Sequence, residues 1–286
     1  MKILTFDLEE WFHIMDNEYL SNVEIWDSFE YRLEKNLDRI LKYLNSKNLK
    51  ATFFCLGWIA DKYPELIRKI NEKGHEIGSH SFSHKLAYKQ NKKDFENDLE
   101  RSIKILEDLT GKKVTSYRAP GFSIKEENIW VFELLTKYGI EKDSSIFPAR
   151  RAHGGLEKFE YSEPFMIDVD GLKIKEFPVN VFKIFNKKIV YTGGGYFRIM
   201  PYFFTKIFSK KSDYVMTYFH PRDFDKNQPI LNELSLYRRF KSYVGLKGSF
   251  KKFKKYIHDF HFIDLCSADK KIDWNLKKII NYKNIK

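Results

Sequence analysis

The stretch TFDLEEWFH, residues 5 to 13, follows a short apolar run and places Asp7, Glu9 and Glu10 within four positions. The apolar residues before and inside it predict a short buried strand, so the acids fall where that strand ends. In α/β proteins the carboxyl ends of parallel strands are where ligands bind and chemistry occurs. This stretch therefore predicts an α/β fold with a functional site built around its carboxylates.

The composition describes a globular chain with ample core material and a strongly basic surface. The chain has 286 residues, of which 43% are hydrophobic and 17% aromatic, and a formal net charge of +12. Much of the basic excess lies in residues 241–256 and 270–280, where we interpret it as the solvated face of helices. No nucleic-acid recognition motif accompanies the charge, so we expect no nucleic-acid partner. Attraction to an anionic membrane surface or to anionic lipid-linked glycans stays open.

Cysteine usage and hydropathy bear on the cellular compartment. Cys55 and Cys266 lie far apart in apolar segments and give no disulfide framework. The first residues do not read as a signal peptide, and no stretch approaches the roughly 20 apolar residues of a membrane helix. We therefore expect a cytoplasmic protein, with peripheral contact at the inner membrane face as the alternative.

Strand-like and helix-like segments alternate along most of the chain. Helices are predicted over residues 28–48, 58–74, 94–111, 126–139, 201–209, 229–245 and 249–259, and strands over 51–57, 75–80, 113–120, 141–148, 214–220 and 260–265. This alternation predicts a distorted (β/α) barrel of about seven parallel strands, with a short-strand insertion near 149–200. No linker or internal repeat is visible, so we expect residues 1–286 to form a single domain with basic C-terminal helices.

Polar side chains recur at the carboxyl ends of the predicted strands. These residues are Asp7, His80, Arg118, Asp143 and His220. Each alone has a structural explanation, because a strand-end aspartate often caps a helix and a strand-end histidine is often only hydrogen-bonded. In a parallel barrel, however, the strand ends converge on one face. Their joint occurrence predicts a site there.

The segment SHSFSH, residues 79–84, places His80 and His84 four positions apart. This spacing is expected to put both imidazoles on one side of a helical turn, within reach of one metal ion. With a carboxylate from TFDLEE they would complete a set of two histidines and one acid that leaves positions for water and substrate. Glu9 and Glu10 both remain candidates for that acid.

Four motifs in fixed order, TFDLEE, HSFSH, RAPGF and YFHP, resemble those of the metal-dependent polysaccharide deacetylases of carbohydrate esterase family four, which share the chitooligosaccharide deacetylase homology domain. The resemblance runs from residue 2 to about residue 266. The segments KDSSIF, EFPVN, GGGYFR and FHPRDFDKNQP are in addition similar to the branch that accompanies bacterial exopolysaccharide and cell-wall gene clusters.

The resemblance implies a division of catalytic roles. Asp7 would take the proton of a metal-bound water, and Arg118 would steady that base. The backbone N–H of Gly121 would help hold the oxyanion, and His220 would protonate the leaving amine. Asp143 is the candidate for orienting His220.

The resemblance also implies a cofactor, one divalent metal ion for which zinc is the expected identity. Glu9, His80 and His84 are the expected ligands. Alternation along a strand puts Asp7 and Glu9 on the same side. Glu10 would then face away, most simply as a charge at a helix start or in a loop.

Substrate contacts are assigned to Phe122, Tyr196 and Arg198. Phe122 is one candidate, with Phe147 and Trp11, for the wall of the acetyl pocket, because no tryptophan follows Asp143 where the family usually has one. Tyr196 and Arg198 belong to GGGYFR, which would shape the substrate groove or mark a tight turn. The chain departs from the family in two further places, since Asp7 is not followed by a second aspartate and the last motif reads HP.

These patterns predict a metal-dependent hydrolase that removes acetyl groups from an N-acetylated, or O-acetylated, bacterial polysaccharide or glycan precursor, acting on carbon–nitrogen bonds of a carbohydrate substrate. An amidohydrolase of a small non-sugar amide and a catalytically inactive carbohydrate-binding relative are the alternatives. Metal content would separate the inactive relative from an enzyme. The sequence leaves the oligomeric state open.

Overall fold

The computed structural model describes residues 1–15, 19–151, 153–185, 187–231 and 234–285. Its strands are β1 (Lys2–Ile3), β2 (Thr5–Leu8), β3 (Thr52–Cys55), β4 (Glu76–Ser79), β5 (Ser116–Tyr117), β6 (Lys142–Asp143), β7 (Phe165–Val169), β8 (Leu172–Glu176), β9 (Phe182–Ile184), β10 (Lys187–Ile189), β11 (Val215–Met216) and β12 (Ile279–Asn281). Its α-helices are α1 (Leu33–Ser46), α2 (Gly57–Lys62), α3 (Pro64–Glu72), α4 (Lys92–Thr110), α5 (Val131–Lys137), α6 (Gly194–Ile199), α7 (Tyr202–Lys211), α8 (Leu236–Tyr243), α9 (Leu246–Asp259) and α10 (Leu265–Asp269).

The main sheet has eight strands in the order β12-β7-β8-β6-β5-β4-β3-β2. From β2 to β8 all neighbours are parallel, whereas β7 runs antiparallel to β8. The register sets Asp7 beside Phe54 and Cys55 beside Ser79. The carboxyl ends of β2, β3 and β4 therefore lie at one level, which brings TFDLEE next to the histidine motif.

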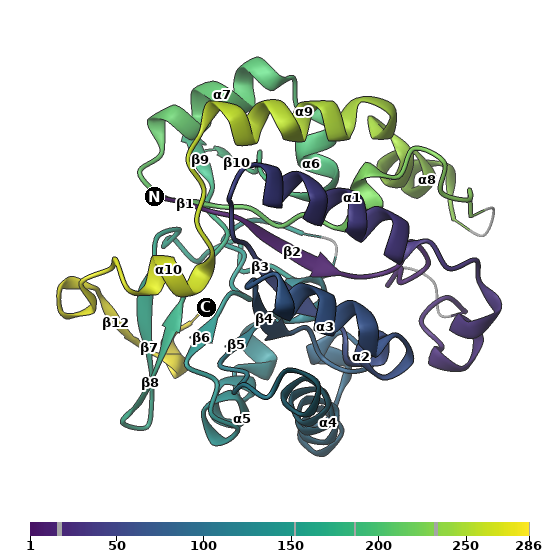
Figure 1. Cartoon of the computed structure of the whole chain (residues 1–286). Helices are drawn as coiled ribbons and strands as arrows, with labels where there is room; N and C mark the ends of the chain where they lie inside the picture. The colour runs from purple at the N-terminus through teal and green to yellow at the C-terminus, as the bar shows by residue number, and fades with distance from the viewer. Residues whose placement is uncertain (16–18, 152, 186, 232–233, 286) are drawn as a thin grey trace.

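The N-terminal segment that forms β1 and β2 also pairs, along its other edge, with the segment around β11. β1 lies parallel to β11, and the backbone N–H of Asp7 donates to the carbonyl of Phe219 at 2.8 Å. Residues 177–180 lie between β6 and β11, where Phe177 N–H donates to the Asp143 carbonyl and Met216 N–H to the Asn180 side chain. The sheet thereby curls round, and the distorted barrel expected from the sequence is confirmed (Figure 1).

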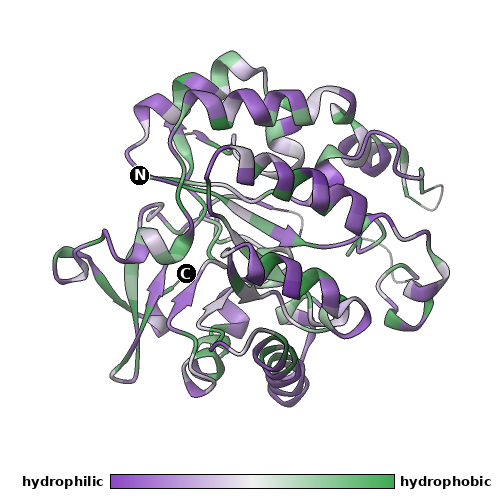
Figure 2. Cartoon of the chain, viewed as in Figure 1, coloured by the Kyte–Doolittle hydropathy of each residue, from purple (hydrophilic) through white to green (hydrophobic). Residues whose placement is uncertain are grey.

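Amphipathic helices cover the outside of this barrel. Figure 1 shows α1, α3, α4 and α5 following the strands in chain order, with α9 beside α1. Tyr43 of α1 and Phe250 of α9 pack edge to face with centroids 6.0 Å apart. Figure 2 shows hydrophilic and hydrophobic positions mixed along these helices, as one buried face and one solvated face require. On α9 the buried positions include Phe253 and Tyr256, so its lysines lie mostly on the outer face.

Several predicted elements differ in detail. The helix predicted over 58–74 is two helices, because Pro64 lacks a backbone N–H and disfavours helical geometry at Tyr63. The strand predicted over 260–265 is reduced to one bridge between Ile263 and Ile3. The region 149–200 holds two hairpins, β7–β8 and β9–β10, and β8 is itself a strand of the main sheet. Among the described residues, no helix is both long and apolar enough to cross a membrane.

Candidate active site

Asp7 and Arg118 form a buried ion pair at the carboxyl ends of β2 and β5. Arg118 Nη1 donates to Asp7 Oδ1 at 2.6 Å and to Thr5 Oγ1 at 2.7 Å. Its Nη2 donates to Ser144 Oγ at 2.9 Å, and the guanidinium lies over the Phe54 ring at 4.2 Å. Removing one partner of a fully buried pair leaves an uncompensated charge, which is why such pairs are kept whole. Arg118 therefore holds the Asp7 side chain in a fixed orientation.

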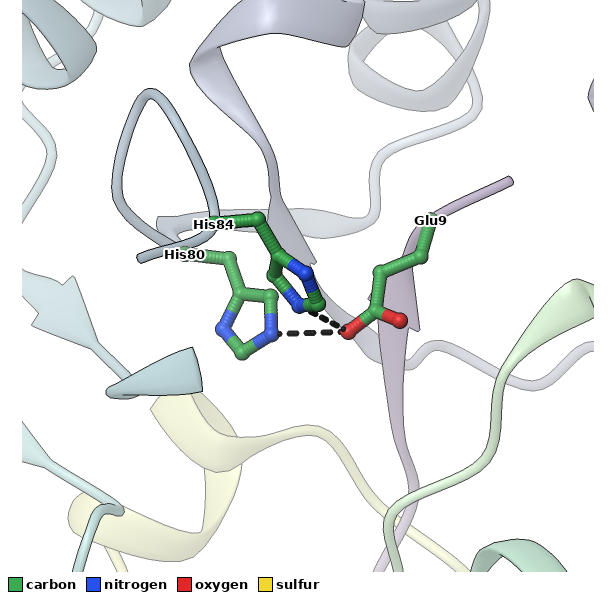
Figure 3. A group of neighbouring side chains, drawn as sticks. All are labelled: Glu9, His80 and His84. Atoms are coloured by element: carbon green, nitrogen blue, oxygen red, sulfur yellow. Dashed lines mark hydrogen bonds and ion pairs between the residues drawn. The ribbon is translucent and has the colours of Figure 1, made fainter. Parts of the chain in front are cut away.

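Glu9, His80 and His84 converge on one point beside this pair (Figure 3). Glu9 Oε1 lies 3.0 Å from His80 Nε2 and 2.8 Å from His84 Nε2, and one ligand atom of each residue lies within 4.8 Å of the others. All three side chains are buried. Two imidazoles and one carboxylate gathered in this way form a donor set that could hold a metal ion.

The hydrogen bonding around His80 tests whether these residues fit a metal. His80 Nδ1 lies 2.7 Å from the carbonyl oxygen of Arg118, which can only accept, so Nδ1 carries the hydrogen. In the neutral ring, Nε2 then presents a lone pair to Glu9 Oε1, which is also an acceptor. Two lone pairs at 3.0 Å are stable only with a cation or a proton between them. The donor set fits a divalent metal, and a backbone carbonyl behind the ring is the usual way to orient such a ligand.

The loop that carries the two histidines is not the helical turn predicted from their spacing. β4 ends at Ser79, and Ser81 and His84 have positive φ values of 67° and 55°. The loop is held by Asp98, which accepts from the backbone N–H groups of Phe82 at 2.7 Å and Ser83 at 2.8 Å. The predicted helical geometry was wrong because these local hydrogen bonds replace it, yet the imidazoles still converge.

Charge around Glu9 favours its ionised form. Burial raises the pKa of Glu9, but the His84 and His220 charges and hydrogen bonds with His80 and His84 outweigh burial and hold this pKa well below its usual value. A carboxylate that stays ionised while fully buried is suited to bind a cation.

Glu10 has a different task, which follows from its opposite orientation. Its Oε1 accepts from the backbone N–H groups of Arg32 and Leu33, both at 2.6 Å, and its Oε2 from that of Trp11 at 3.1 Å. Leu33 is the first residue of α1, so Glu10 lies at a helix start, as expected from strand alternation. Burial raises the pKa of Glu10 to about 7, although these hydrogen bonds oppose the rise.

His220 is oriented by Asp223 and not by Asp143. His220 Nδ1 lies 2.9 Å from Asp223 Oδ2, and its Nε2 lies 3.7 Å from Asp7 Oδ2 and 3.9 Å from Glu9 Oε1. The other Asp223 oxygen lies 3.0 Å from Arg198 Nε. Burial lowers the pKa of His220, but the carboxylates of Glu9, Asp223 and Asp7 outweigh burial and raise it to about 9. These carboxylates favour the protonated form of the ring.

The prediction that Asp143 orients His220 was wrong. Asp143 Oδ1 accepts from Ser145 Oγ at 2.6 Å, and its carboxyl also hydrogen-bonds Glu176 of β8. Burial and the Asp143 charge raise the pKa of Glu176 well above its usual range, so Glu176 is the protonated partner. Asp143 lies at a strand end as expected, but its neighbours turn its side chain away from His220.

Two family profiles match successive parts of the chain. A family profile described as polysaccharide deacetylase matches residues 21–140, and a profile described as a domain of unknown function (DUF3473) matches residues 144–269. Over residues 21–140 the chain is therefore similar to polysaccharide deacetylases. Both matched segments contribute strands to the one main sheet.

Curated relatives of this chain match it over only part of their own length. A peptidoglycan deacetylase of Helicobacter pylori is 35% identical over 113 residues, which is 40% of this chain and 38% of the relative. A peptidoglycan-N-acetylglucosamine deacetylase of Bacillus cereus is 36% identical over 96 residues, 33% of this chain and 35% of the relative. The matched segment therefore spans little more than a third of either relative.

Solved structures share the fold across nearly the whole chain. A Mycobacterium smegmatis protein assigned as a polysaccharide deacetylase has a TM-score of 0.62 at 16% identity, covering 96% of this chain and 90% of that protein. A pseudoenzyme of carbohydrate esterase family four from Bacillus anthracis has a TM-score of 0.50 at 12% identity, covering 98% of this chain and 66% of that protein. At such identities the likeness shows the fold alone.

A cavity of about 260 Å³ opens beside the cluster of Glu9, His220 and Asp223. Its lining residues are Glu9, His13, Ile14, Met15, Arg151, His153, Gly194, Gly195, Tyr196, Arg198, Ile199, Tyr218, His220, Arg222, Asp223, Arg238, Lys241 and Ser242. Tyr196, at 40% exposure, lies on this wall as expected of a substrate contact. Phe122 is instead buried behind Tyr218, with ring centroids 4.9 Å apart, and neither it nor Gly121 is among the lining residues.

Arg198 reaches the cavity but is held by the protein. Besides Asp223 it contacts the backbone carbonyls of Lys241, Ser242 and Val244 at 2.8 to 3.1 Å. Its predicted role as a substrate contact therefore changes to support of Asp223. Gly193, the first glycine of the preceding GGG, is required for close packing, because a Cβ there would lie 2.4 Å from the Tyr218 carbonyl oxygen.

His13 is a site residue that sequence reasoning missed. Its Nδ1 accepts from the backbone N–H of Glu10 at 3.2 Å, and its ring lies against Trp26 and Trp58, with centroids at 4.1 and 5.5 Å. Burial and the His84 charge lower its pKa well below the usual value, so the ring is neutral and Nε2 carries the hydrogen. Within the described residues, this buried Nε2 has no hydrogen-bond partner, and His13 lines the cavity. Its position in TFDLEEWFH, beside the acids, was the available signal.

Proposed function

We propose that this protein is a metal-dependent deacetylase of an N-acetylated bacterial glycan. The observation that carries the proposal is the convergence of Glu9, His80 and His84 within a few ångströms of the Asp7–Arg118 pair and of His220. Metal-assisted hydrolysis of an amide requires a general base, a general acid and a set of metal ligands within one small volume. The named activities of the Helicobacter and Bacillus relatives support a glycan as the substrate.

The metal donors have a defined role in this proposal. A divalent ion held by Glu9, His80 and His84, for which we propose zinc, would polarise the acetyl carbonyl and acidify a water molecule. Zinc accepts nitrogen and carboxylate ligands and keeps a position open for substrate in catalytic sites.

The remaining roles belong to side chains of the chain itself. Asp7 removes a proton from the attacking water, and Arg118 holds Asp7 in the orientation that this needs. His220 delivers a proton from Nε2 to the leaving amine, while Asp223 holds Nδ1 and thereby the ring. His13 offers its Nε2–H to an oxygen of the bound sugar. The N–H of Gly121 is retained as the proposed oxyanion donor.

Similarity to this family does not by itself imply activity, because one structural neighbour is a pseudoenzyme. A protein that only binds carbohydrate would not need the buried Asp7–Arg118 pair beside two histidines that can ligate a metal. A small non-sugar amide as substrate is the second candidate, and direct comparison of substrates separates it from a glycan.

Metal content and acetate release test the proposal together. The purified chain is expected to bind about one zinc ion and, when loaded, to release acetate from N-acetylglucosamine oligomers or from peptidoglycan fragments. The double variant of His80 and His84 to alanine should lose both metal and activity. Asp7→Asn should keep the metal and lose nearly all turnover. Full metal occupancy in the double variant, or a metal-loaded protein that releases no acetate from any acetylated glycan, would refute it.

A further inference from the structure

The cavity beside the proposed site is lined by a surplus of positive charge. Its cationic residues are Arg151, Arg198, Arg222, Arg238 and Lys241, and its carboxylates are Glu9 and Asp223. A cavity enclosed by low-dielectric walls concentrates such a field at its centre. The charge balance of the wall therefore bears on the substrate.

The two carboxylates are already engaged and do not neutralise this surplus. Glu9 Oε1 faces both ligand histidines at 3.0 and 2.8 Å. Asp223 lies between His220 Nδ1 at 2.9 Å and Arg198 Nε at 3.0 Å. A divalent ion at Glu9 would make the wall more positive still. Arg151 and Arg222 face the cavity and form no ion pair with either acid among the described residues.

Arg151 is the most constrained of these cations. Its guanidinium lies 4.8 Å from the Phe122 ring centroid, 5.2 Å from that of Phe147 and 5.6 Å from that of Tyr218. Its Nη1 is buried and has no hydrogen-bond partner among the described residues. A buried charged donor without an acceptor costs several kcal/mol of folding stability at most sites. The presence of such a donor at Arg151 Nη1 therefore indicates that a ligand supplies the acceptor.

Arg222 lies on the same cavity close to the proposed proton donor. It follows His220 by two residues in the 3-10 helix Pro221–Phe224. Burial lowers the pKa of Arg198, and the Arg222 charge lowers it further, as expected of two neighbouring cations. In the described parts of the chain, no carboxylate oxygen lies within 4.0 Å of the Arg151 or Arg222 nitrogens.

From this geometry we infer that the substrate carries an anionic oxygen group, a carboxylate or a phosphate, on the acetylated sugar or on its neighbour, and that Arg151 and Arg222 bind that group. The inference rests on the deacetylase function proposed above. Guanidinium groups match carboxylate and phosphate oxygens with paired hydrogen bonds. A neutral chitin-like oligomer would leave both arginines in the cavity without an anion.

Substrate pairs that differ only in charge test the inference. Acetate release by the metal-loaded protein is measured on three substrates: a neutral N-acetylglucosamine oligomer, an oligomer of equal length with a uronic acid beside the acetylated sugar, and an N-acetylglucosamine phosphate. We expect kcat/KM to be at least about tenfold higher on one anionic substrate than on its neutral counterpart. The preferred anion identifies carboxylate or phosphate as the group recognised.

Variants connect this preference to the two arginines. Arg151→Gln and Arg222→Gln should each reduce the anionic-to-neutral ratio of kcat/KM by about tenfold. Lys211→Gln, which removes an exposed lysine at the end of α7, is the matched control and should leave the ratio unchanged. A ratio near one in the wild type, or an unchanged ratio in both arginine variants, would overturn the inference. Absence of acetate from all three substrates would instead contradict the proposed function.

Discussion

The adjacent acids Glu9 and Glu10 should separate into one metal ligand and one structural acceptor when each is replaced by glutamine. Both substitutions keep the side-chain volume and remove one negative charge. Glu9 faces His80 and His84, whereas Glu10 faces the first turn of α1. The same chemical change made one residue apart should therefore produce opposite phenotypes.

The expected size of each effect follows from the contacts. Glu9→Gln removes the only anionic donor of the set, and changes to residues that merely support a metal ligand already cost 10- to 100-fold in affinity. We expect a loss of at least about tenfold, equivalent to about 1.4 kcal/mol. In Glu10→Gln the amide oxygen can keep the N–H groups of Arg32 and Leu33, but the NH₂ group then meets the Trp11 N–H. One lost acceptor for a buried donor costs roughly 1–3 kcal/mol of folding stability.

Two measurements on the same preparations distinguish these outcomes. Zinc affinity is measured by competition with a chromophoric chelator, and stability is measured by urea unfolding of the metal-free proteins. Glu9→Gln should lose affinity, and Glu10→Gln should lose stability while its affinity stays near that of the wild type. Normal affinity in Glu9→Gln with loss in Glu10→Gln would overturn the ligand assignment.

Three further outcomes follow from contacts at and away from the site. Asp223→Asn should bind zinc normally while turnover falls on the order of 10²- to 10⁴-fold, with a smaller loss on an activated acetyl ester. If Asp143→Asn lost more turnover per folded molecule, Asp143 and not Asp223 would be the residue that orients His220. His13→Phe fills the same volume but has no hydrogen-bond donor, so it should reduce kcat/KM by up to roughly tenfold. His13→Gln retains a donor and should keep most of the wild-type kcat/KM. Equal losses in the two variants would argue against a hydrogen bond from His13 Nε2–H to the sugar. Burial lowers the pKa of His75 to about 4. The unfolded chain therefore binds a proton that the folded chain does not, and stability should fall by roughly 3 kcal/mol as the pH drops from about 6.5 to 4. His75→Asn, which keeps an acceptor for the Ala51 N–H, should flatten this pH dependence, and an unchanged slope would show that another group causes it.

The barrel could be predicted because its signals are local. Buried strands ending in polar residues and helices of period 3.6 both appear in short windows, and the register of β2, β3 and β4 follows from that pattern. Pro64 is also a local signal for a helix break, but the prediction of one helix over residues 58–74 did not take it into account. The pairing of Asp7 N–H with Phe219 is not local and could only be expected from the fold class.

The candidate site was predictable to the extent that strand ends define it. Glu9, His80 and His84 converge, and Glu9 also groups with Asp7 and His220, although the helical turn predicted between the two histidines is absent from the described residues. Side-chain direction beyond a strand end depends on neighbours that sequence spacing does not give. Asp143 therefore looked equivalent to Asp223, although only the 3-10 helix after His220 brings a carboxylate to the imidazole.

The N-terminal strands β1 and β2 have pairing partners on both edges, and the sequence separation of these partners sets an order in which the protein can fold. β2, β3 and β4 are joined by local crossovers, so Glu9, His80 and His84 need contacts spanning fewer than 80 residues of sequence. The other edge must wait for residues 215–219, more than 200 positions away, and long-range pairings of this kind form late because the loop they close is costly in entropy. A partly folded chain would therefore bring together the proposed ligands Glu9, His80 and His84 before His220, the proposed proton donor, arrives. Hydrolysis would begin only when the ring closes, which makes turnover a direct reporter of the final folding step.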